Sequence, residues 1–360
     1  MTLRGELMLS RRRFTLWLAL AAAGLASRDA PVADWLPARL DGSFFQPWRA
    51  DFDELAIWPA RFDLLQHLGC RQLILQWVDY VDGTDRFAAS ADALNRLLDL
   101  AAARGMALRI GLPFDNGYWA AAAADEPKMD AHLKAVLTRQ TRHIETASYA
   151  QHPAFAGWYL PQELDDYTWR RPGFLDRLLD YLSTITAAAA GHDDRLLAVS
   201  TFHSAFAAGG AWPDLWSAIL KRVALVPLIQ DGAGVAAPTG EGHSAASAQL
   251  AERLRADARP FELIIELFEQ LGGDDGRAQQ PFTARAASFA RVRTQLERAV
   301  DLGPGRILGF AVDPYMTDRV AGGRALRRAY LLAALDPRTT RVEDGSERQR
   351  QLQHDAAKPA

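Results

Sequence analysis

The sequence predicts a single α/β domain of the (β/α)8 class, the TIM barrel, over residues 38–337. Short, β-like apolar runs alternate with longer segments of helical period along this whole stretch, and eight such pairs can be counted. Eight consecutive strand–helix units fit a closed parallel barrel better than an open sheet. No Gly-x-Gly-x-x-Gly turn follows the first strand, which disfavours a dinucleotide-binding fold.

The apolar runs place the eight strands, and the segments between them place the helices. We expect strands at 40–46, 72–77, 107–112, 155–160, 196–201, 224–229, 261–266 and 306–312. Helices are expected at 53–68, 91–104, 130–149, 173–190, 244–256, 283–300 and 323–335.

Both ends of the chain differ from this pattern. Arg11, Arg12 and Arg13 precede an apolar run at 16–23, and small residues follow at 24–26. This arrangement predicts a twin-arginine signal peptide over 1–26 and a periplasmic or secreted protein, with an ordinary signal peptide or a retained anchor as the alternative. Residues 338–360 are polar and lack periodicity, so a disordered tail is expected there.

Charge and composition exclude several classes of partner. The formal net charge is −3 and becomes −6 once residues 1–26 are removed, which argues against nucleic acid. Outside the leader no apolar run approaches the roughly 20 residues of a spanning helix, so no stable membrane insertion is expected after signal removal. Cys70 is the single cysteine, so no intramolecular disulfide can form, and packing is the expected role of its side chain. No cofactor is expected.

In a barrel of this class the active site forms at the carboxyl ends of the strands, so the residues that close each strand matter most. In the seventh strand Leu263 and Ile265 belong to the apolar set that meets the helices, which leaves Glu266 on the inward face. In the fourth strand Tyr159 points inward, and the same parity continues to Glu163. In the last strand the bulky residues Leu308, Phe310 and Val312 are expected to face the helices, which directs Tyr315 to the mouth.

Two glutamates therefore converge from the fourth and seventh strands, and cleavage of a glycosidic bond needs two such carboxyl groups. We expect Glu163 to act as general acid/base and Glu266 as nucleophile or base. Further polar and aromatic side chains at strand ends are expected to bind a carbohydrate substrate, since aromatic rings can stack on sugar faces. They are Gln46, Trp48, Trp77, Tyr118, Trp119, Tyr159, Gln162, His203, Asp231, Glu269 and Tyr315.

Each of these residues also has a structural interpretation. Glu163 could cap a helix, Glu266 could pair with an arginine, and the aromatic residues could plug the top of the barrel. Asp231 could shape a turn, since it lies in Gln-Asp-Gly. His203 fits a hydrogen-bonded structural role as well as a proton carrier, and Glu269 is the reserve carboxylate because it has the opposite parity from Glu266.

Three function classes follow from these residues. The first is a glycoside hydrolase acting on a bacterial polysaccharide or a related glycan. The second is a non-catalytic glycan-binding barrel in an exopolysaccharide or secretion system. The third is a metal-dependent hydrolase or deacetylase using His203, Asp231 and the glutamates. No His-x-His or His-Glu-x-x-His spacing supports the third class, and no metal site is expected.

Five ordered motifs carry a resemblance to a known family: GSFFQPW at 42–48, GWYLPQE at 157–163, QDG at 230–232, ELFE at 266–269, and Gly-Phe at 309–310 with Tyr315-Met316. Over residues 40–335 the chain resembles a bacterial family of exported barrels of unknown function that is regarded as glycoside-hydrolase-like. The resemblance implies a TIM barrel and a role connected with polysaccharides, without naming a substrate.

The chain departs from that pattern at Ile264, where the family motif has asparagine two residues before the glutamate. A polar contact at this position is therefore not carried over. The arrangement is also similar to the large retaining clan of glycosidase barrels, whose acid/base and nucleophile lie on strands four and seven. There the acid/base often follows an asparagine, whereas Gln162 precedes Glu163 in this chain.

Overall fold

Eight parallel strands close into one barrel in the computed structural model, as the alternating pattern predicts. The structure describes residues 36–192, 194–204, 207, 211–235, 240–271 and 283–335, with the side chains of 240–244 excepted. The expected signal peptide (1–26) and disordered tail (338–360) lie outside these residues.

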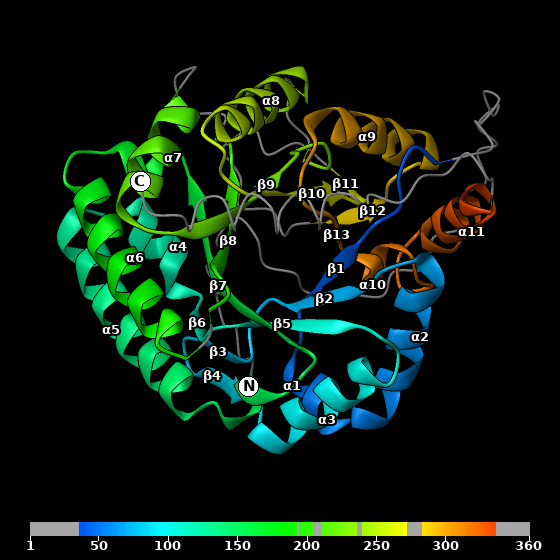
Figure 1. Ribbon diagram of the computed structural model, residues 1–360, viewed down its shortest axis with the longest axis horizontal. Coiled ribbons are helices and arrows are strands. Elements are labelled where there is room, and N and C mark those ends of the chain that lie inside the picture. The colour runs from blue at the N-terminus through cyan, green and yellow to red at the C-terminus, as the bar shows by residue number, and fades with distance from the viewer. Residues whose placement is uncertain are drawn as a thin grey trace, which may run out of the picture.

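The barrel strands follow one another in chain order around the closed sheet, because each pairs in parallel with its predecessor. The helices form a ring outside them (Figure 1). The barrel strands are β1 (Gly42–Phe45), β2 (Gln72–Leu75), β5 (Ala107–Gly111), β7 (Phe155–Asp165), β8 (Leu197–Phe202), β9 (Leu225–Gln230), β10 (Glu262–Glu266) and β13 (Ile307–Phe310).

Eleven α-helices lie in the described part of the chain. They are α1 (Arg49–Asp53), α2 (Trp58–Leu68), α3 (Ala91–Ala102), α4 (Gly117–Ala123), α5 (Glu126–Thr146), α6 (Phe174–Ala190), α7 (Ala211–Arg222), α8 (Gly240–Ala256), α9 (Phe289–Leu302), α10 (Val312–Tyr315) and α11 (Gly323–Ala334). Two small sheets lie beyond the carboxyl ends of the barrel strands. One comprises β3 (Asp79–Asp82), β4 (Asp85–Ala88) and β6 (Phe114–Asp115), and the other pairs β11 (Phe268–Gln270) with β12 (Ala284–Ala286).

Capping side chains explain two helix starts that differ from the periodicity. The expected helix at 283–300 is wrong at its beginning, because the Ser288 hydroxyl accepts the N–H of Arg291 and starts α9 at Phe289, leaving 284–286 to a strand. The helix expected from 130 begins at Glu126, where Asp125 accepts the N–H of Lys128. Pro127 fits there because its missing N–H would have no helical partner.

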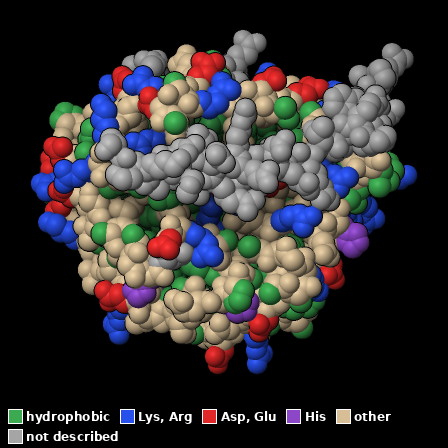
Figure 2. Space-filling model, viewed as in Figure 1, with side chains coloured by type: hydrophobic (Ala, Val, Ile, Leu, Met, Phe, Trp, Pro, Cys, Tyr) green, Lys and Arg blue, Asp and Glu red, His purple; other side chains and the backbone are tan. Residues whose placement is uncertain are grey.

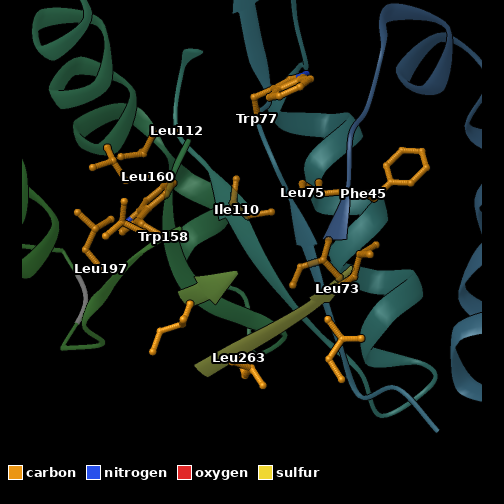
Figure 3. Packing of buried hydrophobic residues seen from close by; sticks show 14 of the residues in the cluster. Phe45, Leu73, Leu75, Trp77, Ile110, Leu112, Trp158, Leu160, Leu197 and Leu263 are labelled. Carbon is orange, nitrogen blue, oxygen red and sulfur yellow. The ribbon is translucent and has the colours of Figure 1, made fainter. Parts of the chain in front are cut away.

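Alternate residues of each barrel strand pack on opposite faces. Leu73 and Leu75 of β2, Trp158 and Leu160 of β7, and Leu263 of β10 belong to one hydrophobic cluster (Figure 3). A separate cluster fills the barrel interior: Phe44, Ile74, Tyr159, Ala198, Val226, Leu228, Ile264, Leu308 and Ala311. The inward position predicted for Tyr159 is therefore confirmed.

The parity predicted for the last strand is wrong. Leu308 belongs to the interior cluster, and Phe310 packs against it with its ring 5.7 Å from that of Phe44. Gly309 instead faces outward, where a Cβ would meet Leu267 at 2.9 Å and Leu40 at 3.1 Å. Side-chain bulk misleads here because the interior of a TIM barrel is itself filled by large side chains.

An ion pair crosses the barrel interior. Glu262 on β10 accepts two hydrogen bonds from Arg109 on β5, at 2.8 and 3.0 Å, and a third from Arg306 at 2.9 Å. Strands β5 and β10 lie four positions apart in the eight-stranded ring, so the pair joins opposite walls. Burial alone would raise the pKa of Glu262, but the two arginines outweigh it and lower this pKa to about 2. Glu262 is thus a buried, fully paired carboxylate.

Candidate active site

Glu163 lies near the carboxyl end of β7, and only 4% of the residue is exposed. The side chain of its neighbour Gln162 points to the helices, since its amide oxygen accepts from Gln140 on α5 at 3.0 Å and from Tyr181 on α6 at 3.2 Å. Side chains alternate along a strand, which directs Glu163 to the opposite, inner side. The Tyr118 hydroxyl donates to the Glu163 backbone carbonyl at 2.6 Å and fixes this part of the strand.

Glu266 ends β10 and is 2% exposed. Its Oε2 accepts the backbone N–H of Gly234 at 2.7 Å. Gly234 fits because it has no side chain: a Cβ there would lie 2.5 Å from the Phe268 carbonyl oxygen and 3.0 Å from the Glu266 Cβ. The loop after β9 thus supplies a fixed donor to the carboxylate at the end of β10.

Asp231 stabilises the same loop through hydrogen bonds to its carboxylate. Its Oδ1 accepts the N–H of Ala233 at 3.2 Å and that of Glu266 at 3.3 Å, while Oδ2 accepts from the side chain of Gln295 at 2.5 Å. Burial raises the pKa of Asp231, and these hydrogen bonds oppose the rise. Asp231 therefore joins the ends of β9 and β10 in addition to shaping the turn that the sequence indicates.

Helix α9 holds this loop from outside. Arg291 donates to the carbonyl oxygens of Ala233 and Phe268, and to that of Glu266 at 3.2 Å. One turn later, Gln295 also donates to the Glu266 carbonyl at 3.3 Å. The sequence pattern did not single out Arg291 or Gln295, since both occur within an ordinary amphipathic helix.

Tyr315 is 1% exposed and packs against Phe268, with ring centroids 5.4 Å apart. Burial raises the pKa of the Tyr315 hydroxyl, and the charge of Glu266 raises it further. Tyr315 is thus a neighbour of Glu266 that stays protonated, and it is mostly packed away from solvent.

The other aromatic strand endings form one connected cluster. Trp77 contacts Trp48 at 5.9 Å and stacks on Phe114 at 5.6 Å, and Phe114 in turn contacts Tyr118. Trp77 and Tyr118 are buried, whereas Trp48 and Trp119 remain half-buried. Part of the predicted aromatic set therefore packs the barrel top, and Trp48 and Trp119 are its more accessible members.

Two predicted site residues, Tyr159 and Glu269, contact other side chains, whereas a third, Gln46, is half-buried at the glutamate end of the barrel. Tyr159 is fully buried in the barrel interior, where its hydroxyl lies 2.8 Å from the Ser200 hydroxyl. Glu269 lies on β11 and pairs with Arg285 of β12 through two contacts of 3.1 Å. Gln46 is half-buried directly after β1, at the same end of the barrel as the glutamates.

His203 follows β8 directly, and its Nδ1 lies 2.7 Å from Oδ2 of Asp166, just beyond β7. Tyr167, the residue after Asp166, is 49% exposed and is one of the few exposed large hydrophobic residues in the described chain. Sequence reasoning missed Tyr167 as a candidate for stacking on sugar, although its place after the fourth strand could have marked it.

Two further observations on the described residues concern metal ions, membranes and surface charge. No group of three or more His, Cys, Asp or Glu side chains is arranged to hold a metal ion there, and none of the helices is long and apolar enough to cross a membrane. Lys and Arg are interspersed with Asp and Glu around the rim of the face seen in Figure 2, so this face carries no broad patch of one sign among the described residues.

Gly234 gives a direct test of the Glu266 geometry. Gly234→Ala is expected to push the loop away from Phe268 and to break the N–H bond to Glu266, so that the variant unfolds at a lower temperature than wild type. Gly191→Ala is the matched control, since its Cβ would meet atoms only at 3.5 Å and beyond. Thermal unfolding of both variants measures the effect; equal unfolding temperatures for the two would contradict it.

Residues 40–320 match the model of the domain of unknown function DUF4434, so the chain belongs to this family. It is also similar to the uncharacterized protein YbcH of Escherichia coli K12, with 24% identity over 268 residues that cover 73% of this chain and 86% of that protein.

Solved structures show the same fold at low identity. A "putative alpha-L-fucosidase" from Bacteroides thetaiotaomicron superposes with a TM-score of 0.60 at 16% identity, covering 87% of this chain and 98% of that one. An endo-β-1,4-mannanase from Thermotoga petrophila gives 0.51 at 14% identity, covering 76% and 68%. A GH113 β-1,4-mannanase gives 0.50 at 12% identity, covering 81% and 99%. The likeness shows that this chain shares the TIM-barrel fold of these proteins.

Proposed function

We propose that this protein is a glycoside hydrolase that acts on a bacterial polysaccharide or a related glycan through a pair of carboxyl groups. The observation that carries the proposal is the placement of Glu163 and Glu266. Glu266 ends β10 and Glu163 lies near the end of β7, so both are at the carboxyl face of one closed barrel; both are almost completely buried, and the Glu266 carboxylate is fixed by a backbone donor. The fold shared with mannanases supports a carbohydrate substrate.

The proposed roles follow from what the reaction requires. Glu163 protonates the oxygen of the leaving sugar, while Glu266 attacks the anomeric carbon or activates water. The Gly234 N–H fixes one Glu266 oxygen, and Asp231, Arg291 and Gln295 hold the surrounding backbone. Preorganised groups of this kind lower the reorganisation that the reaction needs. We propose that Trp48 and Trp119, which keep accessible surface, stack on sugar rings.

The test separates hydrolysis from binding alone. Purified protein is incubated with bacterial exopolysaccharides, mannans and fucosylated glycans, and release of reducing ends is measured beside binding by calorimetry. Wild type should release reducing ends from at least one glycan, whereas Glu163→Gln should bind that glycan and lose turnover. Binding of a glycan by wild type with no turnover on any of them would instead identify a non-catalytic glycan-binding barrel.

We further propose that the protein is exported by the twin-arginine pathway, since Arg11, Arg12 and Arg13 directly precede a modest apolar run. Replacing Arg11 and Arg12 together with lysine keeps the charge and should abolish periplasmic accumulation, measured by cell fractionation. Arg4→Lys is the control outside the motif. Unchanged accumulation of the Arg11/Arg12 variant would contradict this route.

A further inference from the structure

Arg61 of α2 joins two segments at the carboxyl end of the barrel. Its Nη2 donates to Oδ1 of Asp51 at 2.6 Å, in the segment that follows β1. Its Nε donates to Oδ2 of Asp313 at 3.3 Å, in the segment that follows β13. Only 11% or 12% of each of these three side chains is exposed. Since β1 and β13 are paired neighbours in the barrel, one nearly buried guanidinium bridges the segments that follow two adjacent strands.

Two aromatic rings fix this guanidinium. Its central carbon lies 4.4 Å from the ring centroid of Phe45, which ends β1, and 4.9 Å from that of Trp58, which begins α2. Trp58 also donates from Nε1 to the Asp51 backbone carbonyl at 2.6 Å. A guanidinium can stack on rings and donate in two fixed directions at once. Arg61 is thus held in the orientation that both ion pairs need.

The bridge crosses a gap in the packing. A cavity of about 270 Å³ lies between α2 and the segment after β13, and Arg61 and Asp313 line it together with Leu64, Val312 and Thr317. Apolar side chains therefore leave part of the space between the two segments unfilled, and the ion pairs of Arg61 connect the segments there.

One arm of the bridge ends at a residue proposed to stack on sugar. Asp51 Oδ2 accepts the backbone N–H of Trp48 at 2.7 Å, while its other oxygen accepts from Arg61. The Trp48 ring is steeply inclined to the rings of Trp77 and Tyr80, with centroids 5.9 and 5.4 Å away. The Asp51 carboxylate therefore transmits the position of Arg61 to the backbone of Trp48.

The other arm ends beside the Glu266 neighbourhood. Asp313 lies in α10, two residues before Tyr315, whose hydroxyl is close enough to Glu266 for that charge to raise its pKa. The second Asp313 oxygen lies 3.5 Å from Nη1 of Arg319, so this carboxylate is held from two sides. Arg61 thus connects the segment of Trp48 with the segment of Tyr315.

Resting on the proposed function, we propose that Arg61 is a positioning residue that keeps Trp48 and Tyr315 in register, so that a sugar stacked on Trp48 meets the Glu266 carboxylate. Arg61 acts only through Asp51 and Asp313. Its effect on turnover comes from alignment, since a misplacement of about 1 Å far from the chemistry can lower a rate by about 10²-fold.

Replacements of Arg61 test the alignment on a glycan that wild type cleaves. Arg61→Met keeps an unbranched apolar side chain against Phe45 and Trp58 but removes both arms, and kcat/KM should fall on the order of 10- to 100-fold. Arg61→Lys keeps the charge without two fixed donor directions, so its loss should be smaller. Arg104→Met is the matched control, because it removes an arginine–aspartate pair after α3, before β5 begins, and should leave kcat/KM unchanged.

A double-variant cycle separates alignment from stability. Trp48→Ala keeps the backbone N–H that Asp51 accepts but removes the ring. If Arg61 acts through Trp48, Arg61→Met should lower kcat/KM by a smaller factor in the Trp48→Ala background than in wild type. A general loss of folded protein lowers activity by the same factor in both backgrounds, so equal factors would overturn the proposal.

Fluorine NMR of protein labelled with 5-fluorotryptophan reports on Trp48 without any glycan. Its resonance, assigned by its absence in Trp48→Phe, should shift in Arg61→Met and stay in place in Arg104→Met. An unchanged Trp48 resonance in Arg61→Met would overturn the proposal. If Arg61→Met does not fold, Arg61→Lys takes its place in the cycle and in the spectra, and the same outcomes decide.

The results also distinguish this proposal from the proposed function. If wild type cleaves a glycan and Arg61→Met cleaves it equally well, the positioning role is overturned and the function stands. If wild type binds a glycan without cleaving it, the hydrolase function falls, and the same cycle on binding constants decides whether Arg61 positions Trp48. If wild type neither cleaves nor binds any glycan, both proposals fall.

Discussion

Replacing Glu266 with alanine should lower kcat by about 10³-fold or more on a glycan that wild type cleaves, while binding of that glycan persists. The reason is chemical, since alanine supplies neither a nucleophile nor a base. The fold should survive, because the Gly234 N–H that loses its acceptor lies in a loop that Asp231 and Arg291 still hold. Turnover and calorimetric binding measure the two effects.

Glu269→Ala is the matched control for this experiment. Glu269 lies three residues after Glu266, and its side chain is 45% exposed. It pairs with Arg285 on the neighbouring strand β12. We expect a change of less than about 0.5 kcal/mol in stability from losing an exposed pair of this kind. Full activity in Glu266→Ala with loss in Glu269→Ala would reverse the two assignments.

Replacing Glu262 with leucine should destabilise the fold by about 3–5 kcal/mol, because Arg109 is left charged and unpaired inside the barrel. The double variant Arg109→Met/Glu262→Leu should recover most of this loss, since apolar side chains of similar volume often replace a buried pair without cost. Unfolding by denaturant measures both values. Lys134→Met, which breaks an exposed helical pair, is the control and should change stability little.

Glu262 also predicts a pH dependence. Its pKa is about 2 in the folded protein, below the ordinary value of 4.5, so its stabilising contribution is present above about pH 4.5 and is lost as the pH falls towards 2. Wild type should lose stability in that window faster than the double variant does. Parallel profiles of unfolding free energy against pH for wild type and the double variant would contradict this assignment. A Glu262→Leu variant as stable as wild type would contradict it as well.

The sequence predicts the barrel well because its signal is repeated eight times. Each apolar run and each helical segment is weak evidence alone, but the whole series fits one closed topology. The details that failed depend on tertiary contacts. Leu308 and Gly309 exchange faces because both faces of a barrel strand are buried, so residue size does not reveal orientation. Ser288 moves a helix start that periodicity placed six residues earlier.

In the candidate site too, some features could be predicted from the sequence and others depend on tertiary contacts. Glu266 and Asp231 are brought together at the ends of adjacent strands β9 and β10, where their positions after apolar runs indicate a site. Gln162 turns out to bind helix side chains, because side chains alternate along β7 and Glu163 takes the inner side. Arg291 and Gln295 reach the site from α9 across 25 to 64 residues of chain, and no local pattern encodes such contacts.

The central claim is that Glu163 and Glu266 act on one bond as a pair. Its most direct test is kcat for Glu163→Gln, Glu266→Gln and the double variant, with unchanged thermal unfolding as the control. Groups that act as a unit are strongly non-additive. We therefore predict that each single variant loses almost all turnover and that the double variant is no slower than the slower single one. A single variant that keeps more than about half of the wild-type rate would contradict the claim, since removal of a catalytic acid or base lowers rates by about 10²- to 10⁴-fold.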